Sequence, residues 1–146
     1  MNENLSDFVF TSKYARLLGD TRETYEQAID RMLTLHDLKE DYEQVRKHLI
    51  EKRIAPSQRA LQFGGTAIQE KNARIYNCTV SFADRPDFFG EAFYLLLCGC
   101  GVGFSVQKHH VAQLVFNQGT GEQEYLISDS IEGWSNAMKA LANHYF

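Results

Sequence analysis

The sequence predicts an α/β fold preceded by a helical segment, and three observations support that prediction. Apolar residues recur at helical spacing in two stretches before Pro56. Further along, two stretches rich in β-branched and aromatic residues flank a strongly apolar helical stretch. The joins between these three elements are short, so they form a βαβ unit whose strands pair in parallel. We therefore divide the chain into a helical segment, residues 1–55, and an α/β segment, residues 56–146.

Two helices are expected in the N-terminal segment. Asp20 and Thr21 can cap the first, with Glu23 at capping-box spacing from Asp20. Its apolar stripe consists of Tyr25, Ala28, Ile29, Met32 and Leu33. The second helix spans about residues 38–52 and ends before Pro56, because the residue before a proline avoids the helical conformation. Each helix has one apolar stripe opposite a charged face, so both are expected to serve packing.

The α/β segment begins with two expected strands. Residues 59–65 fit a short strand that ends in a glycine turn, and residues 74–82 fit a longer one. In the longer strand, alternation places Tyr76, Cys78, Val80 and Phe82 on one face. A helix with Pro86 near its first position follows and ends at Gly99. Residues 101–106 then form the second strand of the βαβ unit.

Two further elements are expected after a turn at residues 117–121. Residues 124–127 fit a short strand, and Ser128 or Ser130 can cap a final helix. The apolar residues of that helix that face one way are Ile131, Trp134, Met138, Leu141 and Tyr145.

Composition excludes several classes of protein. The 146 residues include 15 Lys and Arg against 19 Asp and Glu, a net charge of −4, and this mild acidity argues against a nucleic-acid binder. No apolar run reaches the roughly 18 residues of a transmembrane helix. The first residues lack the pattern of a signal peptide, so we expect a cytoplasmic protein. In that reducing compartment the three Cys are not expected to form a structural disulfide.

Cys78 allows two interpretations from its position in a strand. A free Cys commonly behaves as a small buried hydrophobe. Alternatively it is a redox thiol, because a strand fixes the direction of a sulfur better than a loop does. The stretch Cys98-Gly99-Cys100-Gly101-Val102-Gly103 offers bare backbone to a ligand. It is not a dinucleotide fingerprint, because it follows a helix and opens a strand, the reverse of that motif.

A zinc site is the third interpretation of these residues. Its ligands would come from the set Cys78, Cys98, Cys100, His109 and His110. Cys98 and Cys100 are closer in sequence than the paired ligands of a closed zinc site, so we do not expect a metal there. We expect His109 and His110 to be surface residues at the end of a strand.

Several motifs, taken in order, resemble the start of a ribonucleotide reductase catalytic subunit. They are Pro56-Ser57-Gln58-Arg59, Gly64-Gly65-Thr66, Asn77-Cys78-Thr79-Val80 and residues 99–105, with Phe10-Thr11-Ser12-Lys13-Tyr14 and Arg22-Glu23-Thr24-Tyr25 before them and residues 129–134 after. The similarity covers nearly the whole chain. It is greatest to the adenosylcobalamin-dependent ribonucleoside triphosphate reductases.

The resemblance implies a fold and residue roles. The fold is a ten-stranded α/β barrel, built from two halves of five parallel strands, of which this chain holds the first βα units. Cys78 would be one of two thiols that reduce the ribonucleotide substrate and become a disulfide. Asn77 would lie near the ribose, and the backbone at Cys100 and Gly101 would contact the substrate. Ser57 and Arg59 would border the ribose or the phosphates.

The resemblance also implies partners, because the family's radical-bearing loop and second redox Cys have no counterpart here. The chain is expected to act only with the remainder of the barrel, with adenosylcobalamin and a thioredoxin-type reductant, and to expose an open edge prone to self-association. It would be a fragment or one product of a split gene. The alternative is a non-catalytic metal- or nucleotide-binding module for regulation or assembly. Neither a nucleic acid nor a membrane is expected as a partner.

Overall fold

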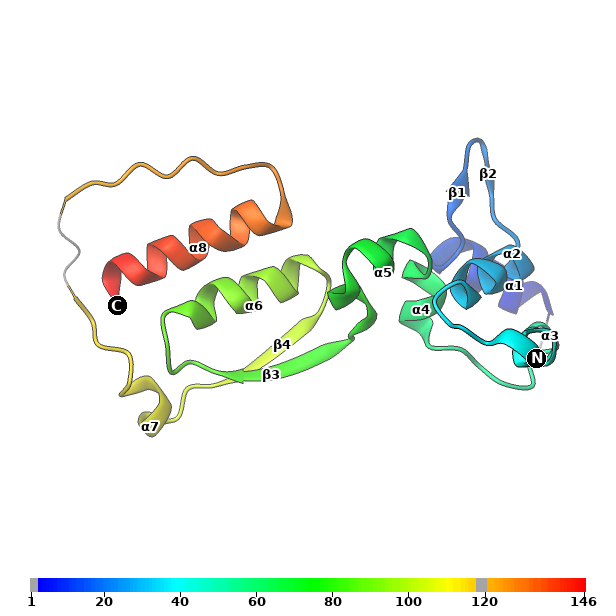
Figure 1. The fold of residues 1–146 in the computed structure, drawn as a ribbon, viewed down its shortest axis with the longest axis horizontal. Helices are drawn as coiled ribbons and strands as arrows, with labels where there is room; N and C mark the ends of the chain where they lie inside the picture. Colours follow the sequence, from blue (N-terminus) through cyan, green and yellow to red (C-terminus); the bar gives the residue numbers. More distant parts are fainter. Residues whose placement is uncertain (1–2, 118–120) are drawn as a thin grey trace. The chain divides into compact units, whose positions relative to one another are not determined.

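The structure is a computed structural model that describes residues 3–117 and 121–146 (Figure 1). The chain divides into two compact units, Met1–Ile75 and Tyr76–Phe146. The division predicted from composition lies at residue 55, whereas the two units meet after Ile75. None of the helices in the described ranges is long and apolar enough to cross a membrane.

The first unit consists of helices and one short hairpin. Its elements are α1 (Glu3–Lys13), β1 (Leu17–Leu18), β2 (Thr21–Arg22), α2 (Tyr25–Leu33), the 3₁₀ turn η1 (Lys39–Asp41), α3 (Tyr42–Ile50), α4 (Gln58–Phe63), α5 (Thr66–Glu70) and the 3₁₀ turn η2 (Asn72–Ile75). Its core is formed by Ala28, Ile29, Met32, Leu33, Leu49, Ala60 and Leu61. The apolar stripe predicted for the first helix therefore supplies much of this core.

The caps of these helices differ from the prediction. Thr24 caps α2 and forms a capping box with Gln27, so Asp20 and Thr21 do not cap it. Glu23 is instead buried, with 4% of its surface exposed. The second helix ends at Ile50, well before Pro56, and Lys52 follows with a φ of 56°. A left-handed residue after the last turn, rather than the proline, ends that helix.

The strand predicted over residues 59–65 is wrong, because this stretch is the helix α4. Ser57 begins it as N-cap, and its hydroxyl accepts a hydrogen bond from the Ala60 amide at 3.4 Å. Ala60 and Leu61 are buried against the core. A serine cap followed by good helix formers outweighs the weak alternation of Leu61 and Phe63.

The second unit contains the predicted βαβ arrangement. Its elements are β3 (Cys78–Phe82), α6 (Asp87–Leu97), β4 (Gly101–Ser105), α7 (Lys108–Val111) and α8 (Ile131–Tyr145). β3 and β4 pair in parallel, with Cys78 opposite Gly101 and Phe82 opposite Ser105. In Figure 1, α6 lies over the β3–β4 pair and α8 lies alongside α6. The mixed α/β class is confirmed, and the sheets in the described residues are two-stranded.

Two predictions for this unit need correction, and one open alternative is decided. The strand begins at Cys78 rather than residue 74, because residues 72–75 form the turn η2. Residues 124–127 form no strand, since no neighbouring strand pairs with them in the described part of the chain. Ser130 caps the last helix, and its hydroxyl accepts from the Gly133 amide at 2.9 Å.

The packing of α8 also differs from what its apolar residues suggest. The helix approaches α6 closely at Gly90, whose carbonyl accepts a hydrogen bond from the Ser135 hydroxyl at 2.8 Å. Lys139 and Asn143 donate to Asp87 at 3.0 and 3.3 Å. Small and polar residues therefore take part in the α6–α8 contact, together with the ring of Phe146, which stacks on that of Phe89 with centroids 5.6 Å apart. Trp134, Leu141 and Tyr145 of α8 are exposed, whereas Ala142 is buried.

Candidate functional site

Cys78 is the first residue of β3 and presents an exposed thiol. Its neighbour across the sheet is Gly101, the first residue of β4. The Gly101 amide donates to the Asn77 carbonyl at 2.9 Å, which fixes the register of the two strands at this end. The predicted place of Cys78 in a strand is thus confirmed, and the ladder hydrogen bond fixes the backbone beside it, whereas the redox role of the thiol stays a prediction.

The thiol lies on the face of the sheet that α6 leaves uncovered. On the other face, the ring of Phe104 contacts that of Phe88 of α6, with centroids 5.1 Å apart. Because side chains alternate along a strand, Cys78 and Val80 point away from that helix. Val80 has 83% of its surface exposed, so this face is open in the second unit.

Gly101 and Gly103 leave the backbone of β4 bare beside the thiol. A Cβ atom at Gly101 would lie 3.8 Å from the Cys78 Cβ, and one at Gly103 would lie 3.6 Å from Cγ1 of Val80. Both glycines therefore belong to the same face as Cys78. Only Gly99 of this motif has a positive φ, 87°, and so makes the turn. Two of the three glycines therefore lie within the strand rather than in a turn, and the predicted approach of a ligand to their backbone stays a prediction.

A serine and a histidine close the far end of this face. Ser105 lies four positions beyond Gly101 on β4, about 13 Å along the strand. Its hydroxyl is 3.0 Å from His110 Nδ1, and the His110 ring lies 4.5 Å from that of Phe82. Sequence reasoning treated His110 as a surface residue only. The signal in the sequence is the short distance between Ser105, which ends β4, and Lys108, which begins α7. It keeps His110 near the end of the strand.

Cys98 and Cys100 do not join Cys78. Each has 2% of its surface exposed, whereas the thiol of Cys78 is accessible. Cys100 immediately precedes Gly101, so strand alternation directs its side chain to the opposite face. The amides of Cys100 and Gly101 donate to the carbonyls of Leu95 and Asn77, each at 2.9 Å, and the predicted contact of this backbone with substrate stays a prediction. All three cysteines are free.

The remaining predicted residues lie elsewhere or serve other roles locally. Asn77 precedes β3, and its carbonyl accepts the ladder hydrogen bond from Gly101. Ser57 belongs to the first unit, where its hydroxyl caps α4. Its predicted contact with ribose or phosphate stays a prediction. The described residues contain no group of three or more Cys, His, Asp or Glu side chains that could hold a metal ion.

The expected use of adenosylcobalamin stays a prediction, and the resemblance implies that most of its binding surface lies outside this chain. A large cofactor needs a cavity that buries most of its surface. The face around Cys78 is open, and the hollows of about 850 and 160 Å³ are lined by neither Cys78 nor Gly101. We therefore assign no residue of this chain to that cofactor.

Comparison of the chain with protein-family models, with curated proteins and with solved structures found no match.

Proposed function

We propose that this chain provides the first βα units of a ribonucleotide reductase barrel and that Cys78 is one of its two reducing thiols. The observation that supports this proposal is the placement of Cys78. Its thiol is exposed at the start of a parallel strand, on the face away from the covering helix, beside the bare backbone of Gly101. In an α/β barrel the helices lie outside, so the face opposite the helix is the interior.

The chemistry requires this kind of position. Two thiols supply two electrons and two protons to the ribonucleotide, the 2′-hydroxyl leaves as water, and the thiols become a disulfide. A strand holds the Cys78 sulfur in a fixed direction. The absence of a side chain at Gly101 allows the sugar ring to approach the backbone closely. The second thiol would come from a later strand of the barrel.

The exposed apolar residues of the sheet also support a larger assembly. Parallel sheets are normally covered on both faces, and an isolated pair of strands is marginally stable at best. Here Val80 has 83% and Phe82 has 48% of its surface exposed on the face that bears Cys78. Further strands that close a barrel would cover these residues. The remaining barrel segment is therefore the partner that this surface fits.

The test combines the chain with a polypeptide that carries the remaining barrel. Adenosylcobalamin, a ribonucleoside triphosphate and a thioredoxin-type reductant are added, and the deoxyribonucleotide is quantified by chromatography. We expect repeated turnover, which Cys78→Ser abolishes. Cys98→Ala is the matched control, because Cys98 is buried and has no assigned role. Normal repeated turnover by Cys78→Ser would refute the assignment of this thiol.

A further inference from the structure

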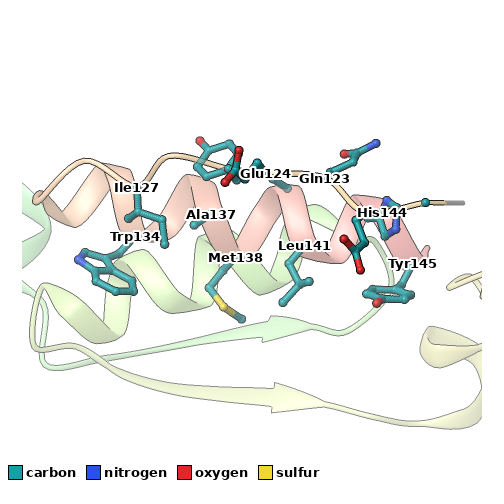
Figure 2. A pocket seen from close by; sticks show the side chains of 13 residues that line it. Gln123, Glu124, Ile127, Trp134, Ala137, Met138, Leu141, His144 and Tyr145 are labelled. Carbon is teal, nitrogen blue, oxygen red and sulfur yellow. The ribbon is translucent and has the colours of Figure 1, made fainter. Parts of the chain in front are cut away.

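A groove runs along α8 in the second unit. Residues 121–127 pass over this helix without forming a helix or strand of their own. The space between them and α8 has a volume of about 850 Å³. Figure 2 shows Trp134, Met138, Leu141 and Tyr145 in a row along the helix, with Gln123 and Glu124 on the extended segment across from them.

Most of this row of apolar side chains is exposed, whereas Met138 is half-buried. Trp134, Leu141 and Tyr145 have 47%, 54% and 42% of their surfaces exposed. The contact with α6 includes Ser135 and Lys139. The spacing of four, three and four residues keeps the row on one side of a helix. This is the spacing with which one helix receives another.

The acidic side chains at the rim of the groove make it negatively charged. The lining contains two carboxylates, Glu122 and Glu124, and one imidazole, His144. Neither lysine nor arginine lines the groove in the described part of the chain. Residues 121–132 hold two more carboxylates, Asp129 and Glu132, and no cationic side chain. Exposed aromatic faces such as that of Trp134 also attract cations.

We propose that this groove is a docking site for a cationic amphipathic helix of a partner protein. The row from Trp134 to Tyr145 is about 17 Å long at the rise of a helix, enough for three turns of a partner. The partner's apolar stripe would pack on the row, and its flanking lysines or arginines would face Glu122 and Glu124. This docking does not depend on the chemistry proposed for Cys78.

Trp134 makes the proposal directly measurable, because it is the only tryptophan of the chain and lies in the groove. The probe is a synthetic peptide of about 18 residues, five helical turns, in which leucines form one face and lysines the other. Binding is followed by the emission of Trp134. The controls are a peptide with glutamates in place of the lysines and a leucine–lysine peptide in scrambled order. We expect a saturable blue shift of the Trp134 emission with the probe. Both control peptides should bind at least about tenfold more weakly than the probe.

Variants separate the groove from other exposed apolar residues. Leu141→Ser should weaken binding of the probe about tenfold. Leu126→Ser is the matched control, because Leu126 is 98% exposed and does not line the groove. It should leave the affinity unchanged. Replacing Glu122 and Glu124 together by lysine should weaken binding of the lysine peptide and strengthen binding of the glutamate peptide.

Three results would overturn the proposal. The first is a Trp134 emission that the lysine probe does not change. The second is equal binding of the lysine and glutamate peptides, since the charge argument would then fail. The third is an emission that shifts with the concentration of the chain alone and is matched by dimer formation in sedimentation, since a second copy would then be the occupant.

Discussion

Replacing Arg31 by methionine should strongly destabilise the first unit. Glu23 has only 2% of its side chain exposed and forms an ion pair with Arg31. The guanidinium donates to both carboxylate oxygens, at 2.5 and 3.0 Å. It also donates to the carbonyls of Leu61 and Gly64 at 2.8 and 2.9 Å, which ties α2 to α4. Methionine keeps the apolar stem of the side chain and removes all four hydrogen bonds.

The magnitude follows from what the substitution leaves behind. Without Arg31, the Glu23 carboxylate keeps only the hydrogen bond from the Arg16 amide, at 3.0 Å. Removal of one partner from a buried ion pair costs about 3–5 kcal/mol, because the other charge stays buried without compensation. Domains of this size are stable by about 5–15 kcal/mol, so the loss is a large share of the total. At an m-value of about 1 kcal/mol/M, the urea midpoint should fall by about 3–5 M.

The assay is urea unfolding of the full chain, followed by far-UV circular dichroism. Arg46→Met is the matched control, because Arg46 pairs with Asp30 at the surface, with 29% and 42% of the side chains exposed. That exposed pair should contribute less than about 1 kcal/mol. The double variant Glu23→Gln/Arg31→Met should be less destabilised than Arg31→Met alone, because it leaves no buried charge. Equal losses from Arg31→Met and Arg46→Met would show that the buried pair is not what holds α2 to α4.

Three other properties can be measured on the same chain. Burial alone would raise the pKa of Glu23, but hydrogen bonds from the Arg31 side chain and the Arg16 amide lower it below its ordinary value of 4.5. The stability that this carboxylate contributes is therefore full above pH 4.5 and is lost as the pH falls through the lowered pKa, so Glu23→Gln should lose less stability in acid. Iodoacetamide should modify Cys78 rapidly in the folded chain and the two buried cysteines only after unfolding, as read by mass spectrometry; equal rates would contradict the strand geometry. Gly90→Ala should lower the free energy of unfolding by about 1–3 kcal/mol, as followed by Trp134 emission in urea, because the new methyl group would lie 2.8 Å from the Lys139 Cβ of α8. An unchanged free energy of unfolding would mean that the two helices are not this close.

Local sequence signals were sufficient for the central βαβ unit. A strongly apolar helix joined by short connections to two short strands admits few alternatives, and the structure shows β3, α6 and β4 in that order. The predictions of secondary structure failed in two situations. In one, the local sequence favours helix and strand about equally; in the other, a strand depends on a neighbouring strand elsewhere in the chain. Residues 59–65 carry both weak alternation and a serine cap, and burial of Ala60 and Leu61 in the core favours the helix. Residues 124–127 have strand-forming side chains, but a strand also needs a neighbour with which to pair.

The candidate site shows the same limit. Alternation along β3 correctly placed Cys78 and Val80 on one face, but only the position of α6 shows that this face is the open one. His110 could not be assigned to it, because its hydrogen bond to Ser105 depends on the path of the chain after β4. The spacing of Glu23 from Asp20 predicts a capping residue, whereas the structure buries the Glu23 side chain. Its burial depends on Arg31, which lies eight residues away and is oriented by the carbonyls of α4 and Gly64.

The glycines of β4 connect the fold to the proposed function. Neither Gly101 nor Gly103 has a positive φ, so the backbone does not require glycine at either position. A Cβ atom at Gly101 would meet the Asn77 carbonyl oxygen at 3.6 Å and the Cys78 Cβ at 3.8 Å, which are ordinary contacts. Glycine within a strand costs about 0.5–1 kcal/mol relative to alanine. Neither backbone geometry nor packing within the second unit therefore explains why these two positions are glycine. The proposed function explains it, because a substrate could then approach the backbone beside Cys78.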